Sequence, residues 1–307
     1  MKKLWAQRGY NQIHNHEKVL YLYEKLGRNF YYYYLHLRNL LTRKQTPMNF
    51  VYMTNSQCTL RCKECHTYIP YFSQDMQYMV DFETFKIEID KLLKSLDIIP
   101  SFRFQGGETL LVKDLAKMVE YACSKKQIQH IQIIANGTVV PSAELIEAMK
   151  NPKVLLSLSD YSCNEELRNR LKYDEIIKLC EAKGVNVKHW LTKAGDLWVG
   201  RNYIKDNDKI DKELAIKNLA VCHCSNSPKV IMFYRGKLYI CPPAVYLANA
   251  NPNFNIPEDE VIDVVNTPSK QLTQKINKLF SKEYYTLCGR CNAYENKDVK
   301  HKPGVQI

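Results

Sequence analysis

Three cysteines stand close together in the sequence, and their spacing is the first sign of chemistry. Cys58, Cys62 and Cys65 lie in the run Cys-Thr-Leu-Arg-Cys-Lys-Glu-Cys. A structural zinc site needs four protein ligands, which usually come as two separated pairs. Three thiolates on one short loop instead suit a cubane iron-sulfur cluster whose fourth iron stays open for another ligand.

A second group of cysteines lies in the last third of the chain. Cys222 and Cys224 precede a predicted hairpin, Cys241 ends it, and Cys288 and Cys291 form a Cys-x2-Cys pair. Four thiolates would close a metal site, and the spacing allows either Cys222 or Cys224 as the fourth. A structural zinc ion and a second iron-sulfur cluster both accept such a set.

The elements that must position these cysteines alternate between strands and helices. An α/β fold with about five or six parallel strands, either an open sheet or a partial (β/α) barrel, follows from this alternation. Functional side chains of such folds lie where strands end, and Cys58 follows the first predicted strand. A small hairpin, turned at residues 234–237, comes later. The predicted strands are 50–53, 102–104, 130–134, 154–158, 185–190, 230–233 and 238–241, and the helices are 82–96, 111–124, 143–149 and 165–183.

Two further motifs follow predicted strands, and with the cysteine triplet they carry a family resemblance. Gly106-Gly107-Glu108 follows the second strand, and Asn136-Gly137-Thr138 follows the third. Over residues 49–200 the chain resembles the radical S-adenosylmethionine (radical SAM) enzymes. The resemblance implies a partial (β/α)6 barrel and a [4Fe-4S] cluster on Cys58, Cys62 and Cys65. The amino and carboxylate groups of S-adenosylmethionine would chelate its open iron.

The resemblance also implies residues that bind S-adenosylmethionine. Gly106 and Gly107 would allow close backbone approach, and Glu108 would accept the ammonium of the methionine moiety. One position departs from the family pattern, because Glu64 stands where an aromatic residue usually touches the adenine. Further polar positions at strand ends would meet the cofactor, although an ordinary polar strand end is an equal alternative: Asn136, Ser157, Ser159 and Asp160.

The second cysteine group resembles the twitch domain, the shorter relative of the SPASM domain, because no cysteine follows Cys291. This implies a closed [4Fe-4S] cluster on Cys241, Cys288, Cys291 and one of the two earlier cysteines. A closed cluster favours electron transfer over substrate binding. The expected cofactors are therefore two [4Fe-4S] clusters and S-adenosylmethionine, with zinc as the alternative for the second site.

The activity implied by the resemblance is reductive cleavage of S-adenosylmethionine to a 5′-deoxyadenosyl radical, which abstracts hydrogen from substrate. The run from Cys65 to Phe72 is similar to radical SAM proteins of bacterial polysaccharide or aminosugar pathways, so we expect a small sugar-like or phosphorylated substrate and its oxidation or rearrangement. Flavodoxin or ferredoxin would supply the electron. The sequence does not single out a base, and the polar candidates are His66, Tyr68, Lys188 and His189.

Two other functions remain open at this point. A peptide-modifying radical SAM enzyme would need a peptide-binding domain, and residues 1–48 are short for one. A non-catalytic metal-binding adaptor, docked through its basic residues, is disfavoured by the double glycine.

Length and composition limit the number of domains and the location of the protein. The chain has 307 residues and is 45% hydrophobic, enough for one large and one small domain. We predict a basic aromatic helical extension over 1–48, the radical SAM core over 49–217 and the auxiliary cluster domain over 218–307. No apolar run reaches the roughly 18 residues of a membrane span, and no signal peptide opens the sequence. A cytoplasmic location and reduced or metal-bound thiols are expected.

The extension holds a net charge of +7 out of +12. An acidic partner is one explanation, but a solvated basic face is the favoured one, and nucleic acid is disfavoured. An apolar stripe predicts a helix that docks onto the main domain, with a membrane-surface helix as the alternative. The stripe consists of Leu20, Tyr23, Leu26, Phe30, Tyr34, Leu37 and Leu41.

Overall fold

The computed structural model describes residues 30–31, 33–190, 197–205, 211–222, 230–251, 254 and 256–307. Its centre is an eight-stranded sheet with the order β5-β4-β3-β2-β1-β7-β8-β9. Neighbours from β5 to β7 pair in parallel, whereas β7, β8 and β9 pair antiparallel. The strands are β1 (Asn49–Met53), β2 (Ile99–Gln105), β3 (Ile128–Ala135), β4 (Val154–Ser159), β5 (Val187–Trp190), β7 (Val230–Tyr234), β8 (Lys237–Tyr239) and β9 (Val261–Asp263).

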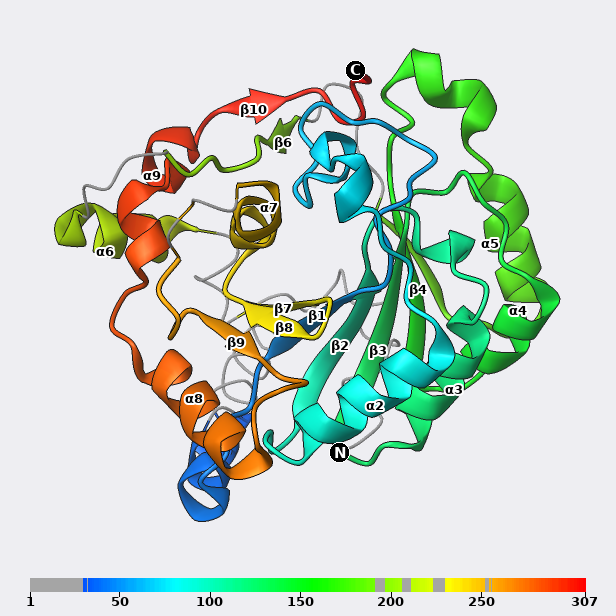
Figure 1. Cartoon of the computed structure of the whole chain (residues 1–307). Helices are drawn as coiled ribbons and strands as arrows, with labels where there is room; N and C mark the ends of the chain where they lie inside the picture. The colour runs from blue at the N-terminus through cyan, green and yellow to red at the C-terminus, as the bar shows by residue number, and fades with distance from the viewer. Residues whose placement is uncertain are drawn as a thin grey trace.

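The predicted α/β fold with a mostly parallel sheet is confirmed, and its shape is that of a partial β/α barrel. Helices follow the parallel strands and cover one side of the curved sheet (Figure 1). They are α2 (Phe82–Leu93), α3 (Leu115–Ser124), α4 (Ala143–Met149) and α5 (Tyr173–Ala182). Farther along the chain lie α6 (Lys212–Val221), α7 (Pro242–Ala250), α8 (Ser269–Ser281), α9 (Ala293–Asn296) and a small pair of strands, β6 (Trp198–Val199) and β10 (Lys300–His301).

The first strand is buried on both faces, which explains its unbroken apolar run. Phe50, Tyr52 and Phe102 are fully buried, and the rings of Phe50 and Phe102 stack with centroids 5.3 Å apart. Near-continuous apolar strands are typical of parallel sheets covered on both sides. The hydroxyl of Tyr52 donates to the Glu88 carboxylate on α2, so the one polar tip in this stack has a buried acceptor.

Three predicted helices are wrong in their extent: the helix over 82–96 ends at Leu93, the helix over 111–124 begins at Leu115, and the helix over 165–183 is interrupted. Residues 165–183 do not form one helix: a 3-10 segment, η4 (Glu165–Arg170), is followed by extended backbone at Leu171 before α5 begins. The interruption has a physical cause at Lys172, whose backbone N–H donates to the Gly137 carbonyl at 2.7 Å instead of to a helix carbonyl. The Tyr173 hydroxyl then donates to Ser159 O at 2.7 Å and fixes the start of α5 against the end of β4.

The expected docking of the N-terminal stripe is also wrong over the part that the structure describes. Residues 30–31 and 33–42 are helical, and the stripe residues Phe30, Tyr34, Leu37 and Leu41 are exposed. The opposite face docks instead, because Asp97 accepts two hydrogen bonds from the Arg38 guanidinium at 2.7 and 2.6 Å. Leu20, Tyr23 and Leu26 lie outside the described residues.

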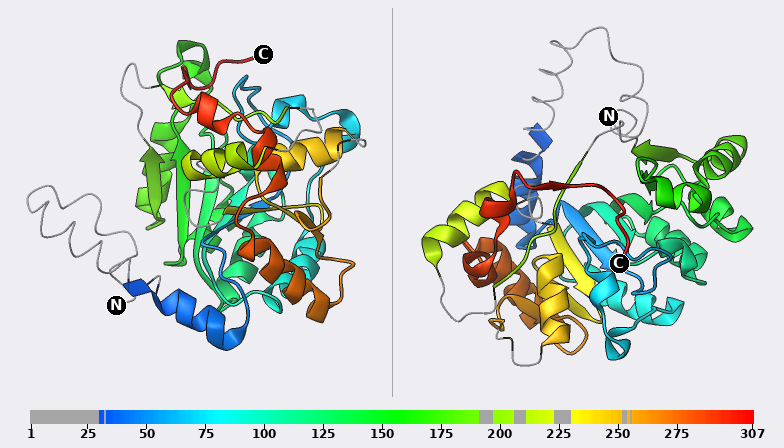
Figure 2. Two further views of the ribbon diagram at one scale, coloured as in Figure 1. Left: turned by 90° about the vertical axis from the view of Figure 1, so that its left-hand side faces the viewer. Right: turned by 90° about the horizontal axis from the view of Figure 1, so that it is seen from above.

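The C-terminal part of the chain joins the sheet through β7, which pairs in parallel with β1. The sheet therefore runs across the predicted domain boundary at 217/218. From there the chain returns to the carboxyl end of the barrel, where its last residues lie beside the cysteine loop (Figures 1 and 2). Among the described residues, no helix is long and apolar enough to cross a membrane.

Candidate metal and cofactor site

The cysteine triplet lies on the loop between β1 and α2, at the carboxyl end of the sheet. All three side chains are partly buried and free of disulfides. Burial raises the pKa of the Cys58 thiol to about 12 and that of Cys62 to about 11, because a thiolate is poorly solvated there. A bound metal would reverse this effect and hold the thiolates deprotonated.

The double glycine packs against this loop. The N–H of Gly107 donates to Asn55 O at 3.0 Å, and the N–H of Glu108 donates to Gln57 O at 2.8 Å. A Cβ at Gly107 would lie 2.0 Å from the Gln57 carbonyl oxygen, and one at Gly106 would lie 2.4 Å from the Asn55 carbonyl oxygen. The close approach that these glycines allow is therefore, at least in part, to the backbone of the cysteine loop itself.

Asn136 brings the third strand end to the same loop. Its side-chain amide donates to Thr59 Oγ1 at 2.9 Å and approaches Cys58 Sγ at 3.6 Å. Its carbonyl oxygen accepts from the backbone N–H of Thr138 at 2.9 Å, which fixes the orientation of the amide. The three motifs named from the sequence thus meet at one end of the barrel.

Glu108 is a fully buried carboxylate. It accepts from the N–H groups of Leu110 at 3.0 Å and Asn136 at 2.8 Å, and among the described residues no lysine or arginine pairs with it. Burial raises its pKa to about 7. A cationic ligand beside this carboxylate would remove the cost of burying it uncompensated, so the residues present fit the ammonium of S-adenosylmethionine.

The predicted positions at the end of β4 are already engaged by protein groups. Ser157 Oγ accepts from Trp190 Nε1 at 2.7 Å, and the Ser159 carbonyl accepts from Tyr173. Asp160 is fully buried, and its carboxylate accepts from both the N–H and the hydroxyl of Ser162 at 3.0 Å. These contacts shape the strand end.

Two of the predicted bases lie on β5. His189 Nε2 lies 3.2 Å from Asp160 Oδ1, without the angles of a hydrogen bond, and its ring packs 4.1 Å from that of Tyr173. Lys188 places its ammonium 3.3 Å from the ring centroid of Trp190. Desolvation lowers the pKa of Lys188.

The other two predicted bases lie on the cysteine loop and contact backbone carbonyls. His66 Nε2 lies 2.9 Å from Val199 O on β6. The Tyr68 hydroxyl donates to Asn202 O, and its ring stacks 4.9 Å from that of Tyr246 on α7. Burial raises the pKa of Tyr68. Both side chains therefore link the loop to the segment that leads to the second cysteine group.

Glu64 takes part in the same link. Its carboxylate accepts from the backbone N–H of Arg201 at 3.2 Å and lies 3.9 Å from the guanidinium. That guanidinium is buried against the rings of Tyr71 at 3.9 Å, Tyr203 at 4.7 Å and Tyr68 at 4.9 Å. The residue that departs from the family pattern thus binds Arg201.

The last residues of the chain cover the cysteine loop, a contact that the sequence analysis missed. The N–H of Lys63 donates to Val305 O at 2.7 Å, and the N–H of Ile307 donates to Arg61 O at 3.0 Å. Gln306 accepts from the N–H of Arg61 at 2.7 Å and donates to Cys62 Sγ at 3.6 Å. No pattern in residues 304–307 indicates this pairing, because it joins segments more than two hundred residues apart.

The second cysteine group is assembled from separate elements. Cys222 ends α6, Cys241 precedes α7, and Cys288 lies in the 3-10 segment η5 (Thr286–Arg290), just before Cys291. Burial raises the pKa of Cys291 to about 11 and also raises those of Cys241 and Cys288, with contributions from their neighbouring thiols. Cys224 lies outside the described residues.

Two polar side chains hold this second group. Asn218 Nδ2 donates to the carbonyls of Cys288 and Cys291, both at 2.7 Å. Glu260 is fully buried, accepts from the N–H of Thr286 at 2.6 Å and pairs with Lys282 at 2.9 Å. Unlike Glu108, this carboxylate has a cation of its own.

Within the described ranges, no three His, Cys, Asp or Glu side chains converge closely enough to hold a single metal ion. Each thiolate of a cubane cluster binds a different iron, so its ligands stand farther apart than those around one zinc ion.

The comparison with family models identifies the core. Residues 52–195, a little less than half of the chain, match the model of the Radical SAM superfamily, so this part of the chain is similar to a radical SAM domain. Members of this superfamily are enzymes, and the family implies a [4Fe-4S] cluster and S-adenosylmethionine. The matched stretch contains the cysteine triplet, the double glycine, Asn136 and the ends of β4 and β5. No curated protein matches the sequence.

Solved structures with a similar fold are distant in sequence. BtrN in complex with AdoMet and 2-DOIA is 16% identical, with a TM-score of 0.48 over 86% of this chain and 98% of that one. Native anSMEcpe with bound AdoMet and Cp18Cys peptide is 14% identical, with a TM-score of 0.47 over 85% and 92%. Streptococcus suis SuiB bound to S-adenosylmethionine is 16% identical, with a TM-score of 0.38 over 48% and 35%.

Proposed function

We propose that Cys58, Cys62 and Cys65 hold an open [4Fe-4S] cluster completed by S-adenosylmethionine, and that the enzyme oxidises a carbohydrate-like small molecule. One observation carries the first part. The cysteine loop, the double glycine and Asn136 meet at the carboxyl end of the sheet around Glu108, a buried carboxylate with no cation among the described residues. A cationic, chelating ligand fits this set.

Each residue of this site has a definable task. Glu108 would receive the ammonium of the cofactor, using the lone pairs that Leu110 and Asn136 leave free. Asn136 and Gln306 donate N–H groups toward the sulfurs of Cys58 and Cys62, and such hydrogen bonds tune a cluster's reduction potential. When bound, the cluster and S-adenosylmethionine would supply a 5′-deoxyadenosyl radical for hydrogen abstraction.

We assign the second thiol group the role of electron acceptor. Cys241, Cys288, Cys291 and either Cys222 or Cys224 would form a closed set of four ligands, which leaves no iron for substrate. The contact through Glu64, Arg201 and Tyr68 supports this role, because it joins the first loop to the segment next to Cys291. Zinc bound by the same four thiolates is the competing assignment.

Arg201 supports a substrate rich in hydroxyl or phosphate groups. Its Nη1 is buried and has no hydrogen-bond partner among the described residues, and an unsatisfied buried donor is costly. Tyr68, Tyr71 and Tyr203 surround it with rings that carry polar tips. A sugar hydroxyl or a phosphate oxygen would satisfy this donor.

His189 is the candidate we favour for taking the substrate proton. Among the described residues its Nε2 has no hydrogen-bond partner, and the buried Asp160 carboxylate lies 3.2 Å away, where it holds the ring in place. His66 and Tyr68, in contrast, already contact backbone oxygens.

Flavodoxin or ferredoxin would deliver the electron in the cytoplasm.

Anaerobic reconstitution tests the proposal. We expect about eight irons per chain and formation of 5′-deoxyadenosine from S-adenosylmethionine and reductant. About four irons with cleavage would refute the second cluster, and zinc without iron would refute the whole assignment. Panels of sugars and of peptides, added in deuterated form, then identify which class transfers deuterium to 5′-deoxyadenosine, and transfer from peptides alone would refute the carbohydrate-like substrate.

A further inference from the structure

The helical residues 30–31 and 33–42 dock onto the domain through a polar face. Tyr31 donates to Gln129 Oε1 at 2.6 Å, Arg38 pairs with Asp97 at 2.6 Å, and Leu35 is buried between them in the sequence. These positions recur at steps of three and four, so they form one side of the helix.

The outward face of this helix is apolar, which inverts the usual arrangement of a surface helix. Six large side chains occupy it at steps of one, three and four. Leucine side chains in such a stripe are normally directed into a core. The exposed fractions are 76% for Phe30, 77% for Tyr33, 44% for Tyr34, 57% for Leu37, 64% for Leu40 and 76% for Leu41.

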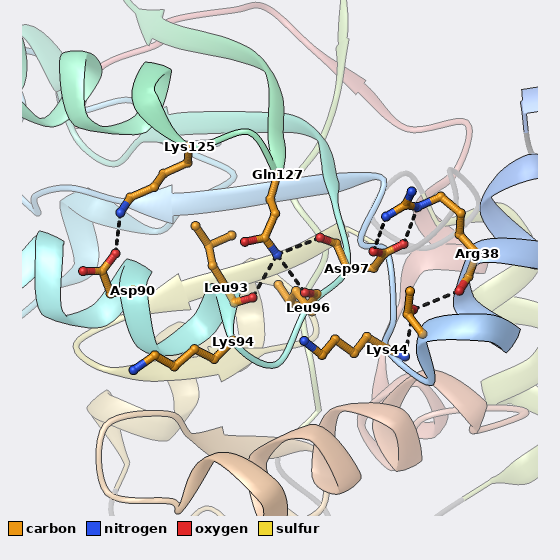
Figure 3. A pocket seen from close by; sticks show the side chains of 10 residues that line it. Arg38, Lys44, Asp90, Leu93, Lys94, Leu96, Asp97, Lys125 and Gln127 are labelled. Carbon is orange, nitrogen blue, oxygen red and sulfur yellow. Dashed lines mark hydrogen bonds and ion pairs between the residues drawn. The ribbon is translucent and has the colours of Figure 1, made fainter.

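A basic groove adjoins the same helix. It has a volume of about 620 Å³, and its lining includes Arg38 and Thr42 from the helix, then Lys44, and Lys94 from the end of α2 (Figure 3). Arg38 and Lys125 pair with Asp97 and Asp90. The ammonium groups of Lys44 and Lys94 have no partner among the described residues, so they are available to an anion.

Apolar stripe and basic groove lie together at one end of the molecule. The helix leads into the amino end of β1, and the groove lies where β2 and β3 begin, so both are at the end of the sheet opposite the cysteines. Figure 2 shows this helix at the far end from the carboxyl terminus.

We propose that this end of the protein docks on an anionic lipid surface. The boundary between acyl chains and anionic headgroups favours aromatic and leucine side chains that lie beside lysines. Phosphate groups of the lipids would meet Lys44 and Lys94, and the six-residue stripe would enter the boundary region. The cysteine end would then face away from the surface, open to substrate and reductant.

Flotation of the full chain with lipid vesicles tests this proposal. Binding is expected to vesicles containing phosphatidylglycerol, not to phosphatidylcholine alone, and should weaken as salt rises from about 0.1 M to about 0.5 M. Leu37→Glu with Leu40→Glu should reduce binding at least about ten-fold. Lys44→Glu with Lys94→Glu should reduce binding to the anionic vesicles only.

Ile216→Glu is the matched control, because this exposed aliphatic residue on α6 lies outside the stripe and groove. It should bind like the parent chain, and circular dichroism should show that all variants are folded. No flotation of the parent chain would overturn the proposal. Flotation that the leucine substitutions leave unchanged would also overturn it. A dimer in light scattering that dissociates in the leucine variant would overturn it as well, because a second copy of the chain would then cover the stripe.

Discussion

The two cysteine groups differ in how the chain assembles them. Cys58, Cys62 and Cys65 lie on one loop, and neighbouring strand ends and the last residues of the chain fix that loop from outside. Cys222, Cys241, Cys288 and Cys291 come from elements far apart in the sequence, joined through Asn218 and Glu260. We therefore expect that the first three cysteines can be substituted without unfolding the chain. The second set is expected to contribute to the stability of the C-terminal region.

The buried carboxylates beside the two cysteine groups, Glu108 and Glu260, differ in whether a cation pairs with them. Glu260 beside the second group has Lys282 as a partner, and Glu108 beside the first has no cation in the described part of the chain. A buried charge without a partner is unfavourable by itself, and a bound cation repairs it. We infer that the second site is complete in protein groups and that the first is completed by a ligand.

Removing the first set gives the largest expected effect. The variant Cys58→Ala/Cys62→Ala/Cys65→Ala should form no 5′-deoxyadenosine and should retain about four irons, because only the second set still binds a cluster. Iron analysis and chromatography of the nucleoside products measure both. Loss of all iron would show that the two sets are not independent.

Removing part of the second set should separate cleavage from product formation. Cys288→Ser/Cys291→Ser is expected to keep about four irons and to cleave S-adenosylmethionine, but to form no oxidised product and to melt at a lower temperature. Cys123→Ser, a thiol outside both groups, is the control and should behave like the parent chain. If the double variant still oxidises substrate, the second cluster is not the electron acceptor.

The buried Glu108 carboxylate should make the stability of the chain depend on pH. The pKa of Glu108 is raised from 4.5 to about 7, so between these values the folded chain holds a proton that the unfolded chain has released. The free energy of unfolding must therefore fall as pH rises through this window, by up to roughly 3 kcal/mol from this group. Glu108→Gln should remove this part of the pH dependence of the free energy of unfolding, which urea titrations of the metal-free chain measure.

A second buried carboxylate, Glu88, also contributes to the pH dependence of the free energy of unfolding. Glu88 also has a pKa raised to about 7, so part of the pH dependence should persist in Glu108→Gln. Glu260→Gln is the matched control at the second site, and it should destabilise the chain at neutral pH by leaving Lys282 without its buried partner. An unchanged pH dependence in Glu108→Gln would contradict the assignment of an uncompensated carboxylate.

The smallest expected effect concerns the cover over the cysteine loop. Gln306→Ala removes a hydrogen bond to the N–H of Arg61 and one to the Cys62 sulfur, and should cost about 1 kcal/mol. With fewer N–H groups directed at its sulfurs, the first cluster should have a lower reduction potential. Electrochemical titration monitored by electron paramagnetic resonance measures this shift, and an equal shift in the second cluster would contradict it.

The sequence predicted what local patterns determine. The alternation of strands and helices from Asn49 to Trp190 is such a pattern, and so is the cysteine triplet at a strand end. The helix predicted over 165–183 failed because its interruption depends on a hydrogen bond from Lys172 to Gly137 in another loop. Periodicity does not report such a contact.

The N-terminal helix shows a second limit. An apolar stripe indicates a surface that avoids water, but it does not say what covers that surface. Here one strong pair, Arg38 with Asp97, docks the polar side and leaves the stripe outside. The partners of Arg201 and Gln306 were equally beyond reach, since they join segments that are remote in sequence.

The central claim, one open site and one closed site, is tested most directly by electron paramagnetic resonance of the reduced, reconstituted protein with and without S-adenosylmethionine. Two cluster signals are expected, and the cofactor should change only one of them. That change should vanish in the Cys58→Ala/Cys62→Ala/Cys65→Ala variant and persist in Cys288→Ser/Cys291→Ser. A response from the second cluster, or no response from the first, would contradict the account.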